Sequence, residues 1–231
     1  MFTFLNYPGA GGTYVSGIND LGQIVGIYYD QSDAPHAFVY SSGTYTPLNI
    51  GECAAGDLGI NNSGQIVSGC GYLFSGGTFS FINVPNSTLT YPNGINESGQ
   101  IVGTYSSASG GGAFLYSGGT YTLFDYPSAT LLYTYGYGIN DAGQIAGAYG
   151  DASGSYGFID TNGAFVSLAY PGAVQGTYAT GINDEGEIVG YYYPVITAPP
   201  PSSAPEPSTG LMGGLGTGAL ILLQVLKTRR H

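Results

Sequence analysis

Short runs of apolar and aromatic residues, separated by Gly, Ser, Asn and Thr, follow one another through residues 2–193. Runs such as HAFVY at 36–40 and TYTLFDY at 120–126 are rich in aromatic and β-branched residues, which favour strands. The chain of 231 residues holds 41 Gly and 13 Pro, which weaken helix interiors and suit tight turns. The pattern predicts an all-β fold of many short strands.

A ten-residue string recurs five times and divides the chain into units. It reads GINDLGQIVG, GINNSGQIVS, GINESGQIVG, GINDAGQIAG and GINDEGEIVG, starting at residues 17, 59, 94, 138 and 181. Two further strand-sized runs follow each of the first four copies, so a full unit has four strands. Four short antiparallel strands in about 40 residues is the size of a β-propeller blade, which predicts a ring of about five four-stranded repeats.

Each copy of the string predicts a hairpin turn. Asn19 can form an Asx turn, the next two residues suit the centre of a type I turn, and Gly22 supplies the positive φ that ends a bulged hairpin. The QIVG run that follows has β-branched residues in its middle, as a buried strand should. The same turn positions recur in every unit: Asn19, Gly22, Asn61, Gly64, Asn96, Gly99, Asn140, Gly143, Asn183 and Gly186.

The last unit lacks two of its four strands. Residues 2–7, FTFLNY, match the fourth strand of a unit, so we expect them to return to the last sheet and close the ring. One strand of that sheet has no counterpart in the sequence, which leaves an open array as the alternative.

The composition changes after residue 193. Residues 194–209 are rich in Pro and Ser and predict an extended linker, so the propeller domain spans residues 1–193. Residues 210–231 combine an apolar stretch with Lys227, Arg229 and Arg230, which predicts a transmembrane helix with its basic end in the cytoplasm.

Charge is distributed unevenly along the chain. The formal net charge is −11, and the only Lys and Arg residues are the three at the C-terminal end. Such a body repels phosphate groups, which argues against a nucleic-acid partner. Cys53 and Cys70 flank one predicted hairpin; we expect a disulfide if the protein is exported, and two buried thiols otherwise.

Few residues offer chemistry. The turn residues Asp20, Glu97, Asp141 and Asp184 could be read as calcium ligands, but turn preference alone explains them, so no cofactor or metal is expected. His36 is the only His before the tail, and no Ser or Cys pairs with it at a recognisable spacing. A glycosidase pair of carboxylates is the remaining enzymatic alternative. We expect no catalytic residues and a protein that is not an enzyme.

Tyrosines are the more useful signal for function. Tyr has a rigid face and a hydroxyl, suited to sugars or proteins, although it is also a good strand former. The tyrosines near strand ends and loops are Tyr28, Tyr29, Tyr133, Tyr135, Tyr137, Tyr191, Tyr192 and Tyr193.

Two resemblances concern location. His36, Ala37 and Phe38, preceded by GINDLGQIVG, resemble the extracellular HAF repeat; other units keep Phe114 and Phe158, or Leu73 in the second. Pro205, Glu206 and Pro207, an apolar span and a basic end resemble the PEP-CTERM sorting signal. That resemblance implies a Gram-negative cell envelope and a membrane-embedded exosortase that removes the tail. Residues 1–12 do not look like a signal peptide, so an upstream start or a truncated gene is expected.

The sequence therefore predicts an exported, non-enzymatic surface or matrix protein that binds extracellular polysaccharide or another envelope component. A structural surface protein without a ligand is the first alternative, and a carbohydrate-active enzyme is the second.

Overall fold

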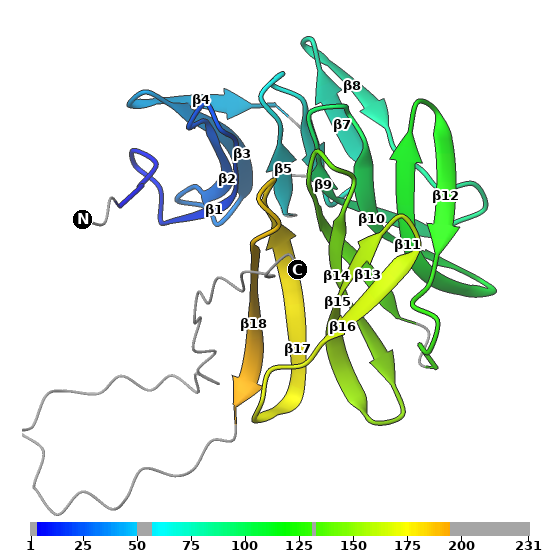
Figure 1. Cartoon of the computed structure of the whole chain (residues 1–231). Coiled ribbons are helices and arrows are strands. Elements are labelled where there is room, and N and C mark those ends of the chain that lie inside the picture. Colours follow the sequence, from blue (N-terminus) through cyan, green and yellow to red (C-terminus); the bar gives the residue numbers. More distant parts are fainter. Residues whose placement is uncertain (1–3, 50–56, 131–132, 195–231) are drawn as a thin grey trace, which may run out of the picture.

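The computed structural model describes residues 4–49, 57–130 and 133–194 (Figure 1). Its first sheet contains β1 (Gly12–Ile18), β2 (Ile24–Tyr29), β3 (Pro35–Ser41) and β4 (Thr44–Leu48). The second contains β5 (Leu58–Ile60), β6 (Ile66–Ser68), β7 (Tyr72–Ser75) and β8 (Thr78–Phe81). Strands follow chain order in both sheets, and neighbouring strands are antiparallel.

The next two sheets repeat this arrangement. The third contains β9 (Leu89–Ile95), β10 (Ile101–Ser107), β11 (Gly110–Ser117) and β12 (Thr120–Phe124). The fourth contains β13 (Thr134–Ile139), β14 (Ile145–Asp151), β15 (Gly154–Thr161) and β16 (Ala164–Leu168). The fifth has two strands, β17 (Ala173–Ile182) and β18 (Ile188–Pro194).

The sheets are arranged like the blades of a propeller. The first strand of each sheet contacts the first strand of the next, from β1 through β5, β9 and β13 to β17, so these strands surround a common axis (Figure 1). The predicted all-β fold and four-stranded unit are confirmed for four blades. The fifth, within the described part of the chain, consists of two strands rather than the expected four.

Residues 4–7 do not form the expected closing strand. Tyr7 instead stacks on Tyr28 of the first blade, with ring centroids 3.6 Å apart. Tyr126 stacks in the same way on Tyr149 of the fourth blade, at 3.6 Å. In both places the tyrosine is followed by a proline, in Tyr7-Pro8 and Tyr126-Pro127, and it packs on the second strand of the blade that follows. The stacking of Tyr7 thus holds the N-terminal segment on the first blade.

The core lies between neighbouring blades. Val25, Val67 and Val102, from the second strands, are fully buried. Each Val packs with the Ile of the next GIN string, as Val102 does with Ile139. The recurring GIN and QIV segments are therefore the two halves of one repeated blade interface.

A glycine in the second strand makes room for a phenylalanine of the third. Gly147 pairs with Phe158, and a Cβ on this Gly would clash with the phenylalanine ring and with the carbonyl of Tyr135. The second blade differs, because its register places Tyr72 opposite Ser68, whereas Leu73 lies opposite Val67. Leu73 is therefore not the counterpart of the HAF phenylalanine, as the sequence had suggested; Tyr72 is.

No helix in the described ranges is long and apolar enough to cross a membrane. The predicted linker at 194–209, apart from its first residue, and the predicted transmembrane helix at 210–231 lie outside these ranges.

Candidate functional site

The five hairpin turns form a hydrogen-bonded chain across the blades. In each turn the glycine N–H donates to the asparagine carbonyl, as Gly64 does to Asn61 at 3.0 Å, and the glycine has positive φ. The Asn61 side chain accepts from the N–H of Gln65 at 2.9 Å and donates to its Oε1 at 2.8 Å. Nδ2 of Asn61 also donates to the carbonyl of Asn96 in the next blade, at 3.0 Å.

The same bond joins all neighbouring turns. Asn19 donates to Asn61 at 3.0 Å, Asn96 to Asn140 at 3.1 Å, and Asn140 to Asn183 at 3.0 Å. The predicted turn residues thus form a directional chain, in which each blade donates to the next one along the sequence. The sequence indicated the local turns but not these links between blades.

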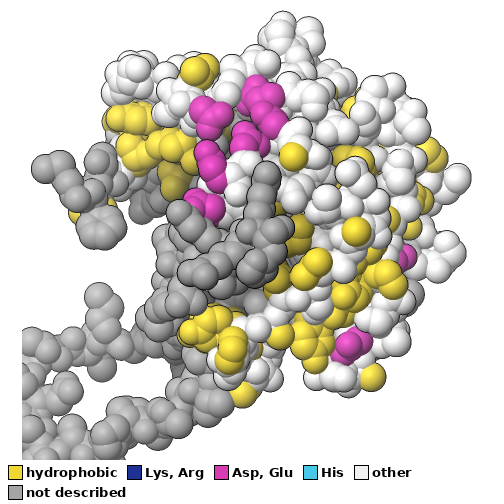
Figure 2. Space-filling model, viewed as in Figure 1, with side chains coloured by type: hydrophobic (Ala, Val, Ile, Leu, Met, Phe, Trp, Pro, Cys, Tyr) yellow, Lys and Arg dark blue, Asp and Glu magenta, His cyan; other side chains and the backbone are white. Residues whose placement is uncertain are grey.

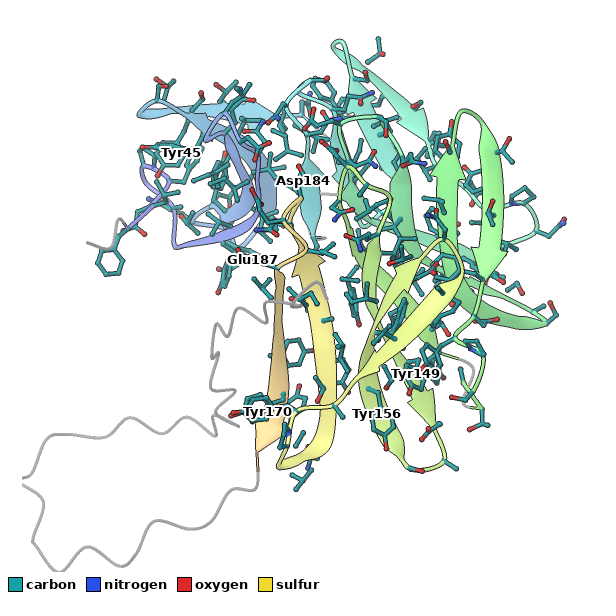
Figure 3. All side chains as sticks on the ribbon, in the orientation of Figure 1. Tyr45, Tyr149, Tyr156, Tyr170, Asp184 and Glu187 are labelled. Atoms are coloured by element: carbon teal, nitrogen blue, oxygen red, sulfur yellow. The ribbon has the colours of Figure 1, made fainter. Side chains whose placement is uncertain are left out.

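The acidic turn residues also join blades. The N–H of Glu97 donates to Oδ1 of Asp141 at 2.8 Å, and the N–H of Asp141 donates to Oδ1 of Asp184 at the same distance. Asp184 lies at the turn of the last hairpin (Figure 3), and acidic side chains gather on this face (Figure 2). The carboxylates of Glu97, Asp141 and Asp184 each accept a backbone N–H from the preceding blade, and Asp20 accepts from the side-chain amide of Asn62. A structural role therefore accounts for these residues.

Metal binding has little support in this region. Within the ranges that the structure describes, no group of three or more His, Cys, Asp or Glu side chains could hold a metal ion. The calcium interpretation of the turns therefore gains no argument from the geometry.

A pocket of about 630 Å³ lies among the second, third and fourth blades. One wall is a ladder of tyrosines on and beside β13, in which Tyr133 and Tyr135 are 5.9 Å apart and Tyr135 and Tyr137 are 5.8 Å apart. Their rings are almost parallel, with interplanar angles of 6° and 2°. We call this site the axial tyrosine pocket; its lining also includes Asp57, Tyr91, Asn93, Thr104 and Ser106.

Burial affects the pKa of two tyrosines of the ladder, Tyr135 and Tyr137. Burial raises the pKa of Tyr137 well above its ordinary value, and nearby Tyr191 adds to the shift. Burial also raises the pKa of Tyr135, with Tyr133 and Tyr178 contributing. Their hydroxyls therefore remain neutral and can donate hydrogen bonds to a ligand at ordinary pH.

One buried polar atom of a residue that lines the pocket lacks a hydrogen-bond partner in the described part of the chain. This atom is Oγ1 of Thr104. Buried hydroxyl groups without a partner are unusual because losing hydration without a replacement bond costs free energy. A ligand hydroxyl that reached Thr104 would supply the missing bond.

The repeat explains why tyrosines gather at the axis. Four of the five units have a tyrosine three residues before the glycine of the GIN string, on the first strand of the blade: Tyr14, Tyr91, Tyr135 and Tyr178. The sequence interpretation selected Tyr133, Tyr135, Tyr137 and Tyr191 but missed this repeated position. Aligning the five units on their glycines would have revealed it.

His36 lies away from this pocket, in the first blade. Its Nε2 is 2.9 Å from Oδ2 of Asp30, and both side chains are partly exposed. Hydrogen bonds from Ser32 and His36, then from the amides of Ala34 and Ser32, hold the pKa of Asp30 well below its usual range. A lowered pKa stabilises the fold above the ordinary carboxyl pKa, and this contribution is lost as the pH falls. In the described part of the chain, no Ser, Thr or Cys side chain is hydrogen-bonded to His36.

The remaining predicted sites fall on residues outside the described ranges. Cys53 is one of them, so its disulfide with Cys70 stays a prediction; Cys70 itself lines the axial tyrosine pocket. The same holds for the sorting motif and basic cluster: Pro205, Glu206, Pro207, Lys227, Arg229 and Arg230.

Comparison with solved structures supports the class of fold. No family model and no curated protein matches the chain. A structural-genomics target named as a gluconolactonase shares 13% identity, with a TM-score of 0.50 over 79% of this chain and 73% of that one. A virginiamycin B lyase from Staphylococcus aureus also shares 13% identity, with a TM-score of 0.51 over 83% of this chain.

The chain spans 65% of the length of that lyase. A fucose-specific lectin from Aleuria aurantia shares 12% identity, with a TM-score of 0.45 over 79% of this chain and 70% of that one, a likeness too low to support an argument. The chain is thus an all-β protein of β-propeller-like architecture. At these identities the comparisons concern the fold and not the activity.

Proposed function

We propose that the chain is a non-enzymatic envelope or matrix protein that binds an extracellular polysaccharide in the axial tyrosine pocket. The parallel ladder of Tyr133, Tyr135 and Tyr137 is the observation that supports this best. Tyrosine combines a flat apolar face with a hydroxyl, and sugar rings likewise combine apolar faces with polar edges. Asn93 and Ser106, which also line the pocket, add polar groups for the sugar hydroxyls.

The negative charge of the protein limits which polysaccharides we expect to bind. Asp57 lies in the pocket, and no Lys or Arg occurs before Lys227. A polymer rich in uronate or sulfate would meet uncompensated repulsion at this site. The ligand we propose is therefore neutral.

Tyr135→Ala is expected to weaken binding to a neutral exopolysaccharide about tenfold, because it removes the middle ring of the ladder. Isothermal titration calorimetry with purified polysaccharides measures the change. Tyr14→Ala is a matched control, since Tyr14 occupies the equivalent position in the first blade but does not line the pocket.

The alternatives give different results. Failure to bind any native exopolysaccharide would leave a structural protein without a ligand. Release of reducing ends from a bound polysaccharide, abolished by Asp57→Ala, would instead indicate a carbohydrate-active enzyme. Equal affinity of the Tyr135→Ala and wild-type proteins would show that the sugar binds elsewhere.

We also propose that the PEP-CTERM-like tail directs the protein to the cell envelope and is removed by an exosortase. The expected result is an extracellular form that ends near Pro205. Mass spectrometry of the cytoplasmic, membrane and medium fractions of the native host measures this. A full-length chain found in the cytoplasm would rule out the sorting role.

A further inference from the structure

Three blades bury a phenylalanine above a glycine. In the first, third and fourth blades, a third-strand Phe with no exposed surface lies directly opposite a second-strand Gly. The pairs are Gly26 and Phe38, Gly103 and Phe114, and Gly147 and Phe158. In each pair a Cβ on the glycine would clash first with a backbone carbonyl of the first strand and would also press against the phenylalanine ring. The glycine is therefore needed both for the close approach of the first strand and for the ring.

The second blade shows what happens when the glycine is absent. Ser68 occupies the position, and the residue opposite is Tyr72, which is only partly buried. The glycine also accompanies an irregularity in the pairing of the first and second strands, which the fifth blade has and the second blade lacks. The glycine therefore leaves room for a phenylalanine in the third strand but does not by itself indicate one.

The fifth blade keeps the glycine without the phenylalanine. Gly190 lies opposite Ala179 and approaches the carbonyl of Tyr178, as Gly147 approaches the carbonyl of Tyr135. Above Gly190 is a groove of about 510 Å³, which Leu168, Tyr170, Ile188 and Tyr192 also line. Hydrophobic side chains are visible around this end of β17 and β18 (Figure 2).

Two walls of a phenylalanine site are already present in this groove. Tyr170 and Tyr192 stack with ring centroids 3.9 Å apart, and Tyr170 lies beside β18 (Figure 3). The equivalent rings in the fourth blade, Tyr126 and Tyr149, stack at 3.6 Å, and Tyr126 lies 5.9 Å from Phe158. The fifth blade thus repeats the surroundings of Phe158.

The edge of the sheet is open at the same place. In the described part of the chain β18 pairs with β17 alone, whereas the second strand of every other blade pairs on both sides. An open edge strand offers a row of N–H and C=O groups that an extended peptide can pair with.

We infer that the β18 edge is an acceptor site for an extended strand of a partner protein, whose phenylalanine enters the groove above Gly190. The buried phenylalanines of this chain define the chemistry of that strand. A small residue precedes each one, as Ala113 does, and an aliphatic residue follows, as Leu115 does. The partner strand therefore carries Ala or Gly, then Phe, then Val, Leu or Ile.

The segments of residues 1–231 fit less well as occupants. Residues 195–231 contain no Phe, Tyr or Trp. The Phe residues of the third strands in a second copy are fully buried, so donating one would unfold a blade. Residues 2–7 match a fourth strand, and Tyr7 is held on the first blade. A strand that is not part of a folded blade meets none of these obstacles. This site is also separate from the axial tyrosine pocket, and does not depend on sugar binding.

The test uses the full chain and a fluorescein-labelled peptide of residues 110–117, GGGAFLYS, as a model of the partner strand. Fluorescence anisotropy is expected to show saturable binding, and alanine in place of the peptide phenylalanine is expected to weaken it at least tenfold. In the protein, Gly190→Ser copies the residue found at position 68 and is expected to weaken binding similarly. Gly12→Ser is the control, because a Cβ there meets only the side chain of Tyr14. Circular dichroism verifies that both variants are folded.

Binding that is unaffected by both the peptide change and Gly190→Ser would overturn the inference. No binding by the intact chain would also overturn it. If a variant lacking residues 1–6 then bound the peptide, the occupant would be the chain's own N-terminal segment. If dilution below the dimer concentration restored binding, the occupant would be a second copy.

Discussion

Phe158→Ala is expected to lower the free energy of unfolding by about 3–5 kcal/mol. The Phe158 ring has no exposed surface, and it packs against Tyr126 and Phe165 with centroid distances of 5.9 and 5.7 Å. Above Gly147 no other side chain can take its place, so the substitution leaves a cavity in addition to losing buried area. Urea unfolding monitored by circular dichroism measures the change.

Phe81→Ala provides the comparison for this prediction. Phe81 is also a strand phenylalanine, but 73% of its surface is exposed. Its replacement is expected to change the free energy of unfolding by less than about 1 kcal/mol. Similar losses in the two variants would mean that Phe158 is not part of a close-packed core.

Asn61→Ala is expected to lower the free energy of unfolding by about 2–4 kcal/mol. Asn61 is 1% exposed, and its side chain holds its own turn and bonds to the carbonyl of Asn96. Truncation leaves that carbonyl and the N–H of Gln65 without side-chain partners in a buried region, and unsatisfied polar groups are costly there. Thermal and urea unfolding give the change.

Asn183→Ala is the matched control, because Asn183 occupies the same position in the last turn. In the described part of the chain its side chain bonds to Glu187 of its own turn and to no other blade. We expect a loss of about 1 kcal/mol, the usual value of a more exposed hydrogen-bonded turn. Equal losses at positions 61 and 183 would show that the link between blades contributes nothing.

Much of the fold could be predicted because the repeat carries local information. The GIN string specifies a turn through Asn19 and Gly22, whose preferences depend on their own backbone, and the spacing of the copies indicates four strands per unit. These features can be predicted without knowing which residues far apart in the sequence are in contact. They account for the agreement in the first four blades.

Contacts between blades were not predictable in the same way. The amide of Asn61 reaches a carbonyl 35 residues later, and nothing in the local sequence distinguishes that bond from a bond within the turn. The error at Leu73 has a similar origin, because the connection between β6 and β7 is short and places Tyr72, one residue before Leu73, opposite Ser68. A one-residue shift exchanges the two faces of a strand.

The candidate site was visible only as an excess of tyrosine. The sequence could not show that Tyr133, Tyr135 and Tyr137 stack in one ladder, or that Asp57 from another blade lies in the same pocket. These positions depend on the rotation from one blade to the next. That rotation is set by the packing of neighbouring blades against one another.

The hydrogen bonds between the asparagine turns make the first and the last blade different. Within the described residues, the first turn donates to its neighbour without receiving such a bond, whereas the last turn receives one and donates none to another blade. In a linear array, a terminal unit loses the stabilisation of one neighbour, so cooperative melting begins at the ends. The two-stranded last blade has the smaller interior of the two terminal units, and fraying should therefore start there and spread toward the N-terminal blades.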